Sequence, residues 1–229
     1  MTQPAAAPLL AIFDHDGVLV DSLALHQHGW LELGRLENLP VTAEFIHETF
    51  GMTNPDIFRK LLGGEVTPAD LQRFGDLKEG AYRSAAAGRI CLMEGVRELL
   101  DALTAAGVLL AIGSSGVRPN LDLTVSECGL AGRFAAIASL EDIRRGKPDP
   151  EVFLAAASKA GVPPARAVVF EDAPVGIRAA KAAGMIAVGV GTTHPLETLH
   201  EAGADLAVQT LVGFDVPSLL ARMADAPRS

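Results

Sequence analysis

Two carboxylates two positions apart follow the first run of apolar residues in the chain. The run covers residues 9–13, Asp14 ends it, and Asp16 comes two residues later, directly before Gly17. Residues two apart in an extended segment face the same way, so the two carboxylates are expected to project together. Neighbouring carboxylates repel each other unless a cation or a shared proton relieves the repulsion. The spacing therefore indicates cation binding or acid–base chemistry; the alternative is a surface loop in which Asp is an ordinary turn residue.

Three later segments also place polar side chains after apolar runs or before a helix. Two serines and a glycine follow the second apolar run, where hydroxyls and free N–H groups at a helix start suit a phosphate. A lysine precedes a helix that Pro150 opens, and two acids end a further apolar run. Each segment alone is unspecific, because Ser/Gly turns and solvated lysines are common. The residues concerned are Ser114, Ser115, Gly116, Lys147, Glu171 and Asp172.

Apolar runs of this kind are typical of strands that are buried on both faces of a parallel sheet. Helical patterns that end at a glycine lie between most of them. This alternation predicts an α/β fold with a doubly wound, mainly parallel sheet. Ligands of such sheets bind outside the carboxyl ends of the strands, so the polar residues above are expected to meet there. The predicted strands are residues 9–13, 108–112, 167–170, 186–190 and 206–208.

The region from about residue 23 to residue 87 breaks the alternation, because it holds helical patterns and no convincing strand. Helix starts are indicated at Thr42, which could cap a helix, and at Asn54-Pro55 and Thr67-Pro68. A proline is tolerated in the first turn of a helix, because the N–H that it lacks would have no partner there. An all-helical block after the first strand predicts an inserted small all-helical cap. The expected domains are a core of residues 1–21 and 88–229 and a cap of residues 22–87.

The charge of the chain limits its partners. The 229 residues carry a formal net charge of −9, which argues against nucleic acid and against anionic membrane surfaces as partners. No uninterrupted apolar run approaches the ~20 residues of a membrane span. A small anionic ligand remains compatible with this charge, because a pocket can differ in sign from the whole. We expect a small-molecule ligand and a monomer or weak homodimer.

Cysteine usage and the N-terminal residues indicate the compartment. Cys91 and Cys128 are two isolated thiols, which form neither a zinc site nor a disulfide framework. Residues 1–8 are rich in Ala and Pro and lack both a basic segment and a long apolar segment, so no signal peptide is predicted. We therefore expect a cytoplasmic protein.

Taken together, the polar segments resemble the haloacid dehalogenase-like superfamily. The resemblance extends over nearly the whole chain, to about Thr193, and implies a doubly wound, Rossmann-like core. The helical block after the first motif resembles the small cap of the β-phosphoglucomutase-like subgroup. The matching segments are Asp14-x-Asp16-Gly17-Val18-x-x-Asp21-Ser22, Ser114, Gly146-Lys147-Pro148-Asp149-Pro150 and Glu171-Asp172-x-x-x-Gly176-Ile177-x-Ala179-Ala180-x-x-Ala183-Gly184.

The resemblance implies a role for each matched polar residue. Asp14 would attack phosphorus and become an aspartyl phosphate. Asp16 would protonate the leaving oxygen and then deprotonate the attacking water. Ser114 and Lys147 would hold the oxygens of the transferring phosphoryl group. His15, between the two acids, is expected to face away from the substrate and to pack or support.

The resemblance also implies a Mg²⁺ cofactor. The ion would bind the Asp14 carboxylate, the backbone carbonyl of Asp16 and Asp172, with Glu171 bound directly or through a neighbour. A ligand set made only of oxygen atoms suits a hard cation, and the positive charge of the ion would reduce the repulsion between the carboxylates.

Substrate choice is expected to lie in the cap. His26 follows Asp14 by twelve residues, like a histidine that lies beside the general acid in phosphoglucomutase members; the alternative is a surface histidine. Asn54 stands where those members have an arginine that grips the distal phosphate, and this departure weakens the mutase interpretation. Lys78 resembles a cap lysine that points at the substrate in many relatives. Arg118 could hold a second anionic group, or it could be a solvated side chain. The expected substrate-binding residues are His26, Asn54, Lys78, Ser115, Gly116 and Arg118.

The sequence thus predicts a Mg²⁺-dependent phosphatase that hydrolyses small phosphorylated metabolites such as sugar or polyol phosphates. The alternative enzyme is a phosphosugar mutase of the β-phosphoglucomutase type, which would isomerise its substrate faster than it releases phosphate. A third interpretation is a non-catalytic binding protein on the same fold, because a fold alone does not imply a function.

Overall fold

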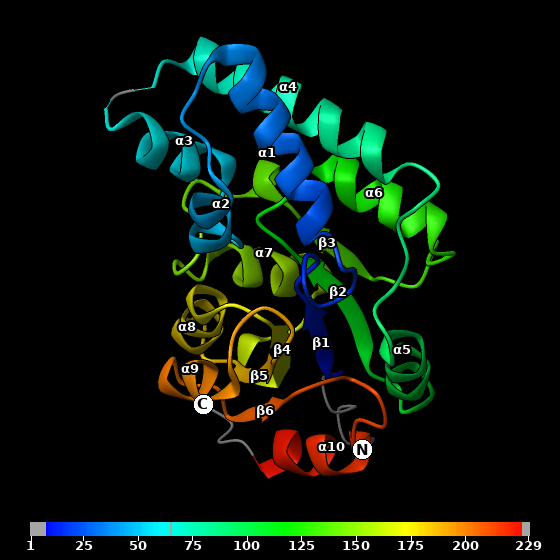
Figure 1. Cartoon of the computed structure of the whole chain (residues 1–229). Coiled ribbons are helices and arrows are strands. Elements are labelled where there is room, and N and C mark those ends of the chain that lie inside the picture. Colours follow the sequence, from blue (N-terminus) through cyan, green and yellow to red (C-terminus); the bar gives the residue numbers. More distant parts are fainter. Residues whose placement is uncertain (1–7, 65, 226–229) are drawn as a thin grey trace.

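Six parallel strands form one sheet in the order β3-β2-β1-β4-β5-β6 (Figure 1). The computed structural model describes residues 8–64 and 66–225. The prediction that residues 1–8 form no signal peptide concerns residues that lie mostly outside the described part of the chain. The strand order reverses between β1 and β4, which is where open α/β sheets bind ligands. The strands are β1 (Leu10–Phe13), β2 (Leu109–Gly113), β3 (Ala136–Ala138), β4 (Ala167–Glu171), β5 (Ile186–Val190) and β6 (Leu206–Val208).

The apolar strands are buried because helices cover both faces of the sheet. Side chains of β1 alternate between the two layers: Ala11 and Phe13 pack with α5 and α10, while Leu10 and Ile12 pack with α7, α8 and α9. This confirms the predicted α/β fold with a doubly wound sheet. The covering helices are α5 (Val96–Ala105), α6 (Arg118–Glu127), α7 (Glu151–Ala160), α8 (Pro174–Ala182), α9 (Leu196–Glu201) and α10 (Val216–Asp225), with short 3-10 helices η1 (Leu140–Asp142) and η2 (Pro164–Arg166).

Strand β3 was not predicted from the sequence. It has three residues, two of them alanine, and pairs in parallel with β2 from Ala136 opposite Ala111 to Ala138 opposite Gly113. Alanine is depleted in strands, and a run this short carries little periodicity. Its formation therefore depends on pairing with β2 rather than on local preference.

Among the described residues, four helices form the insert between β1 and α5, and they lie apart from the sheet at the top of Figure 1. Three of them begin at the predicted threonine or proline positions, since Thr42, Thr53 and Thr67 each accept a backbone N–H as the N-cap residue. The insert has its own apolar cluster, which includes Trp30 and Phe58. Its helices are α1 (Leu23–Glu37), α2 (Ala43–Thr49), α3 (Asn54–Leu62) and α4 (Pro68–Ala86).

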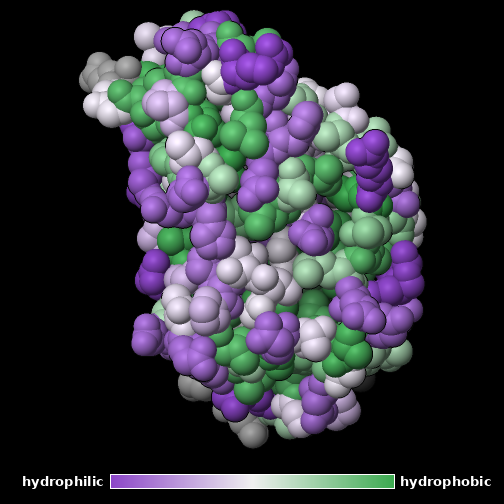
Figure 2. Space-filling model, viewed as in Figure 1, coloured by the Kyte–Doolittle hydropathy of each residue, from purple (hydrophilic) through white to green (hydrophobic). Residues whose placement is uncertain are grey.

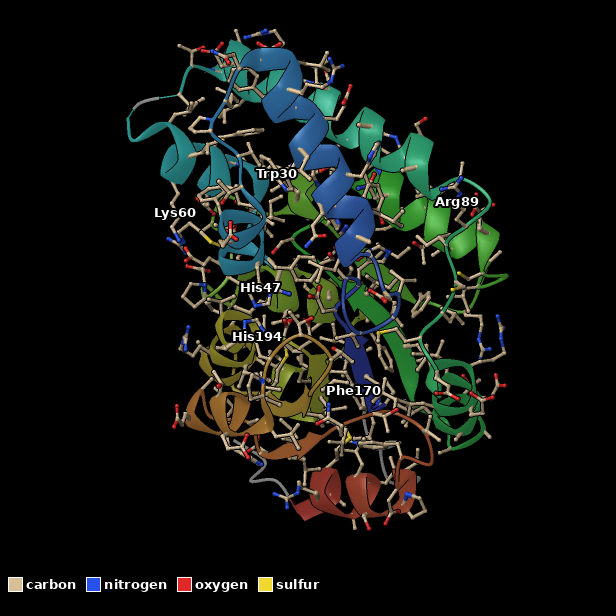
Figure 3. The ribbon with its side chains drawn as sticks, viewed as in Figure 1. Trp30, His47, Lys60, Arg89, Phe170 and His194 are labelled. Atoms are coloured by element: carbon tan, nitrogen blue, oxygen red, sulfur yellow. The ribbon has the colours of Figure 1, made fainter. Side chains whose placement is uncertain are left out.

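The two chain segments that connect the insert to the core lie side by side. Val20, on the outgoing segment, forms an antiparallel bridge with Leu92 on the returning one. The N–H of Met93 donates to the carbonyl of Leu19 at 2.9 Å. On the far side of the insert, His47 of α2 stacks on His194 of the core with ring centroids 6.1 Å apart (Figure 3). The insert is thus joined to the core at both edges.

The surface described here mixes polar and apolar residues. Figure 2 shows hydrophilic and hydrophobic residues interspersed on one face, over the insert and the core alike. Within residues 8–64 and 66–225, no helix is both long enough and apolar enough to cross a membrane.

Candidate active site

Three buried acids meet at the point where the strand order reverses. Asp14 directly follows β1 and Glu171 ends β4, while Asp172 comes one residue later. The N–H of Asp14 donates to the carbonyl of Phe170 at 2.9 Å, which extends the ladder between β1 and β4. Carboxylate oxygens of the three acids lie within 4.8 Å of one another. The pairing of two central strands therefore brings together acids that are more than 150 residues apart in the chain.

Two glycines give these acids the room that they need. Gly17 has φ +76°, in the left-handed region that favours glycine, and a Cβ atom there would collide with the Asp172 carboxylate. A Cβ atom at Gly176, in α8, would collide with Glu171. Both glycines belong to the predicted motifs, and their close approach to the acids requires a residue without a Cβ atom.

Lys147 is the buried cation beside the acids. Its Nζ atom lies 3.0 Å from Asp14 Oδ2 and 2.7 Å from Glu171 Oε2. Burial alone would lower the pKa of this ammonium, but the two carboxylates raise it above its usual value. Burial and the Asp14 charge raise the pKa of Glu171 to about 7. Burial and the charge of Glu171 raise the pKa of Asp172 well above its usual value. Lys147 alone thus compensates only part of the negative charge of the three acids.

The acids fit a divalent cation with oxygen ligands. Asp14 Oδ1 and Asp172 Oδ2 are buried and have no hydrogen-bond partner among the described residues. Buried carboxylate oxygens without partners are costly, and a hard cation such as Mg²⁺ would satisfy them. The residues that would hold it are Asp14, Asp172 and, beside them, Glu171.

Mg²⁺ is expected to stabilise the protein against heat. At one hundred times its Kd, the ion would raise the free energy of unfolding by about 2.7 kcal/mol, or Tm by roughly 5–10 °C. Thermal unfolding with Mg²⁺ and with EDTA measures this shift without using activity. In Asp172→Asn the shift should largely disappear, whereas in the control Asp122→Asn, at an exposed ion pair with Arg118, it should persist. An equal shift in Asp172→Asn would contradict the assignment.

Asp16 lies in a different environment from Asp14. Its Oδ1 accepts hydrogen bonds from His15 Nδ1 and His26 Nε2, each at 3.0 Å, and from the hydroxyl of Ser22. Burial favours the neutral acid, yet His15 and His26 hold the pKa of Asp16 well below its usual value. Its Oδ2 forms no hydrogen bond within the described residues and is the oxygen left for chemistry. His15 therefore contacts Asp16 rather than facing away from it, and its Nε2 lies 2.7 Å from Thr124 Oγ1.

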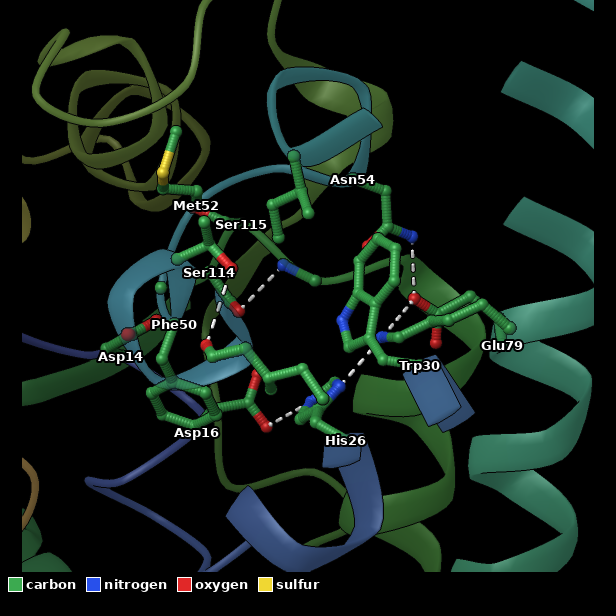
Figure 4. A pocket seen from close by; sticks show the side chains of 16 residues that line it. Asp14, Asp16, His26, Trp30, Phe50, Met52, Asn54, Glu79, Ser114 and Ser115 are labelled. Atoms are coloured by element: carbon green, nitrogen blue, oxygen red, sulfur yellow. Dashed lines mark hydrogen bonds and ion pairs between the residues drawn. The ribbon is translucent and has the colours of Figure 1, made fainter. Parts of the chain in front are cut away.

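His26 is oriented by a lysine of the insert. Lys78 Nζ lies 2.7 Å from His26 Nδ1 and 2.8 Å from Glu79 Oε1 (Figure 4). An ammonium has only donors, so His26 Nδ1 accepts and its Nε2 carries the hydrogen that is donated to Asp16. Tyr82 stacks on the imidazole ring with centroids 4.4 Å apart. The hydrogen bonds therefore select one tautomer of His26.

A pocket between insert and core brings most of the predicted site residues together (Figure 4). The pocket is partly open and has a volume of about 40 Å³. The hydroxyl of Ser114 accepts from the N–H of Gly116 at 3.0 Å, while the buried hydroxyl of Ser115 has no partner among the described residues. Asn54 Nδ2 donates to Glu79 Oε1 at 2.7 Å. The predicted residues that line it are Asp14, Asp16, His26, Asn54, Lys78, Ser114, Ser115 and Gly116.

Arg118 lies outside this pocket, and Glu79 lies inside it. Arg118 is not among the lining residues of this pocket; its exposed guanidinium pairs with Asp122 at 2.7 Å. Glu79 lines the pocket but was not predicted. Its Oε1 accepts from Lys78 and Asn54, and its Oε2 accepts from Asn120 Nδ2 of the core at 2.6 Å. The available signal was its place beside Lys78 on the buried side of α4, among Phe74 and Tyr82.

The fold and the site define a doubly wound α/β enzyme with a buried acid–lysine centre beneath a helical insert. A family model described as haloacid dehalogenase-like hydrolase matches residues 9–184. The chain therefore belongs to the haloacid dehalogenase-like hydrolases, in agreement with the resemblance in its motifs.

Three known proteins illustrate what the chain is similar to. Validoxylamine A 7′-phosphate phosphatase of Streptomyces hygroscopicus subsp. limoneus is 33% identical over 199 residues, 84% of this chain and 90% of that protein. β-Phosphoglucomutase of Bacillus subtilis (strain 168) is 31% identical over 205 residues, 86% of this chain and 88% of that protein. The structure of a hydrolase from Pseudomonas syringae superimposes with a TM-score of 0.80 and 28% identity, covering 93% and 97% of the two chains.

Proposed function

We propose that the protein is a Mg²⁺-dependent phosphatase of small phosphorylated metabolites, of the sugar or polyol phosphate type. The observation that carries the proposal is the contrast between two carboxylates of one pocket. Asp14 is paired with Lys147 and keeps one oxygen without a partner, while Asp16 is anchored through Oδ1 and keeps Oδ2 free. One acid is thus suited to nucleophilic attack and the other to proton transfer. The likeness to a phosphatase and to a phosphoglucomutase supports a phosphate ester as the substrate.

The proposed reaction has two steps. In the first, a carboxylate oxygen of Asp14 attacks phosphorus and the bond from phosphorus to the leaving oxygen breaks. Asp16 Oδ2 delivers a proton to that oxygen; the anionic substrate beside Asp16 would oppose the lowering of its pKa by His15 and His26 and so let it take up this proton on binding. In the second, Asp16 Oδ2 takes a proton from water, and the water oxygen attacks the aspartyl phosphate to release inorganic phosphate and Asp14. Ser114 and Lys147 hold the phosphoryl oxygens. When bound, Mg²⁺ would neutralise charge on the phosphoryl group.

Asp16→Asn tests the proton-transfer role through the leaving group. Turnover of a sugar phosphate is expected to fall by about 10²–10⁴-fold, because an alkoxide leaves poorly without a proton. p-Nitrophenolate needs no proton to leave, so p-nitrophenyl phosphate should give a rapid burst of about one equivalent, followed by slow dephosphorylation. Stopped-flow absorbance measures the burst. Equal slowing of both substrates without a burst would contradict the role of Asp16.

The insert is proposed to act as a cap, with residues 22–87 as the cap and residues 1–21 and 88–229 as the core. His26 and Lys78 of the insert contact the Asp16 region directly. Closure of the insert would exclude bulk water while Asp14 carries the phosphoryl group.

A phosphosugar mutase is the second candidate, favoured by the 31% identity to β-phosphoglucomutase. A mutase must hold a second phosphate, but no arginine is among the described residues that line the pocket, and Lys78 is already paired with Glu79. The test is a panel of metabolite phosphates with Mg²⁺, with product and phosphate release measured together. Phosphate release faster than isomerisation supports the phosphatase, whereas isomerisation primed by a bisphosphate and faster than release would support the mutase.

A further inference from the structure

The two cysteines of the chain are isolated in the sequence but lie on neighbouring segments of the fold. The chain between α4 and α5 returns from the insert to the core and passes the end of α6 (Figure 3). There the N–H of Gly88 donates to both carboxylate oxygens of Glu127, at 2.9 and 3.0 Å. Cys91 lies on this returning connection, and Cys128 directly follows α6. The connection and the end of α6 are therefore held side by side.

The sulfur of Cys128 contacts the backbone on both sides of Cys91. Its thiol donates to the carbonyl of Ile90 at 3.8 Å. Burial and, after it, the Cys91 thiol raise the pKa of Cys128, while a hydrogen bond from the N–H of Leu92 acts in the opposite direction. Standard bond lengths place Cys128 Sγ within about 7 Å of the Cys91 Cα atom. Because the sulfur is held from both sides of Cys91, it lies within reach of that side chain.

The two thiols differ in their access to solvent. Cys91 is exposed, whereas Cys128 is 8% exposed and belongs to an apolar cluster of the core. Arg97 Nη2 donates to the carbonyl of Cys128 at 2.7 Å, which fixes the backbone of this residue on the core. A dissolved oxidant therefore reaches Cys91 first, since oxidation needs an accessible sulfur. The sheltered thiol of Cys128 is then the nearest partner for the oxidised sulfur.

We propose that Cys91 and Cys128 are a redox modification site at which hydrogen peroxide forms an intramolecular disulfide. First, the Cys91 thiolate attacks a peroxide oxygen and the O–O bond breaks. This gives a sulfenic acid and a hydroxide ion, which takes up a proton and leaves as water. Second, the Cys128 thiol gives up its proton and attacks the Cys91 sulfur, the S–O bond breaks, and a second water leaves. The two thiols lose two electrons in total, and the peroxide accepts them.

The disulfide cross-links the returning connection to the core. Leu92, the next residue after Cys91, forms the bridge with Val20 at the base of the insert. A covalent bond at Cys91 therefore restrains residues 87–92, the segment between the end of α4 and this bridge. The site does not depend on the proposed phosphatase function, because neither cysteine lines the pocket between insert and core.

The experiment treats the unmodified protein with hydrogen peroxide and then with dithiothreitol. Free thiols should fall from two per chain to none, and the mass of the chain should decrease by two hydrogen atoms. Peptide mapping without reductant should find Cys91 joined to Cys128, and a non-reducing gel should show a single chain rather than a linked pair. Dithiothreitol should restore both thiols.

Two variants separate the roles of the two thiols. In Cys128→Ala, oxidation of Cys91 should stop at the sulfenic acid, which dimedone traps. In Cys91→Ser, Cys128 should lose its thiol at least tenfold more slowly than Cys91 does in the unmodified protein, because solvent does not reach it. Should Cys128→Ala not fold, the peptide map of the unmodified protein and the Cys91→Ser rate still decide the question.

Amide hydrogen exchange measures the restraint on the returning connection. Residues 87–92 should exchange at least threefold more slowly in the disulfide form than in the reduced form. Peptides from α9, which packs on β5 and β6 at the other end of the sheet, should exchange at the same rate in both forms. Unchanged exchange of residues 87–92 in a protein that holds the disulfide would remove the proposed cross-link restraint.

Three further results would overturn the disulfide itself. A dimer joined through Cys91 of two chains would show that the exposed thiol meets another molecule before it meets Cys128. Loss of the Cys91 thiol alone would show that the two sulfurs do not come together. Oxidation of Cys128 in Cys91→Ser as fast as in the unmodified protein would show that Cys91 is not the first site of attack.

Discussion

Asp14→Asn is expected to lower the rate of phosphate release from any phosphate monoester by about 10⁴-fold or more, because the nucleophile is lost. An amide oxygen is a poor nucleophile, and the remaining groups can hold a phosphate but cannot form the aspartyl phosphate. Lys147, Ser114 and Asp16 would remain in place, so binding of inorganic phosphate should survive. The measurement is Mg²⁺-dependent release from p-nitrophenyl phosphate and from a sugar phosphate.

The same substitution should not unfold the protein. Asp14 contributes to the raised pKa values of Glu171 and Asp172, so its neutralisation relieves repulsion among the buried acids. We expect Tm in EDTA to be unchanged or higher. The control is Asp101→Asn, which removes an exposed carboxylate paired with Arg133 and should leave activity unchanged. Phosphate release at the original rate from Asp14→Asn would refute the nucleophile assignment.

Lys147→Met is expected to reduce both stability and activity. It removes the cation between Asp14 and Glu171, and breaking a buried ion pair from one side costs about 3–5 kcal/mol. Without the ammonium, the pKa of Glu171 rises further above its unfolded-state value. A carboxyl group with a raised pKa in the folded state loses stabilisation as pH increases through that range. The deficit in the free energy of unfolding should therefore be larger at pH 8 than at pH 5.5.

Chemical unfolding in EDTA at both pH values measures this deficit. Mg²⁺ should restore part of the stability, because a bound cation replaces some of the lost positive charge. The control is Lys159→Met at a partly exposed ion pair with Asp142, where we expect about 1 kcal/mol or less at either pH. A deficit that shrinks as pH rises would contradict the compensation of Asp14 and Glu171 by Lys147.

The central strands and the acids that follow them could be predicted from the sequence because both signals are local. The apolar run before Asp14 and the run that ends at Glu171 are long enough to indicate buried strands, and each stops at a carboxylate. The helix starts at Thr42 and Thr67 could be predicted as well, since an N-cap residue and the helix that follows it are neighbours in the chain.

Other parts of the site depend on contacts that no local pattern records. Glu79 meets Asn120, a residue 41 positions away on a helix of the core, and nothing in the sequence around either residue indicates the other. Arg118 was expected near the substrate because of its place after the Ser114 loop, but its side chain leaves the loop along the exposed face of α6 to reach Asp122. Proximity in the chain could not show that direction.

The bridge between Val20 and Leu92 holds together the two ends of the insert, so the insert is a branch attached to the core at one place. Because the two connecting segments pair with each other at this bridge, a different helical or β module could be attached there while β1 and β2 keep their places. The sheet would still present Asp14, Lys147 and Asp172 in the same arrangement. If the insert acts as the proposed cap, exchange of this one branch would alter which molecules reach the acids while the core stays the same.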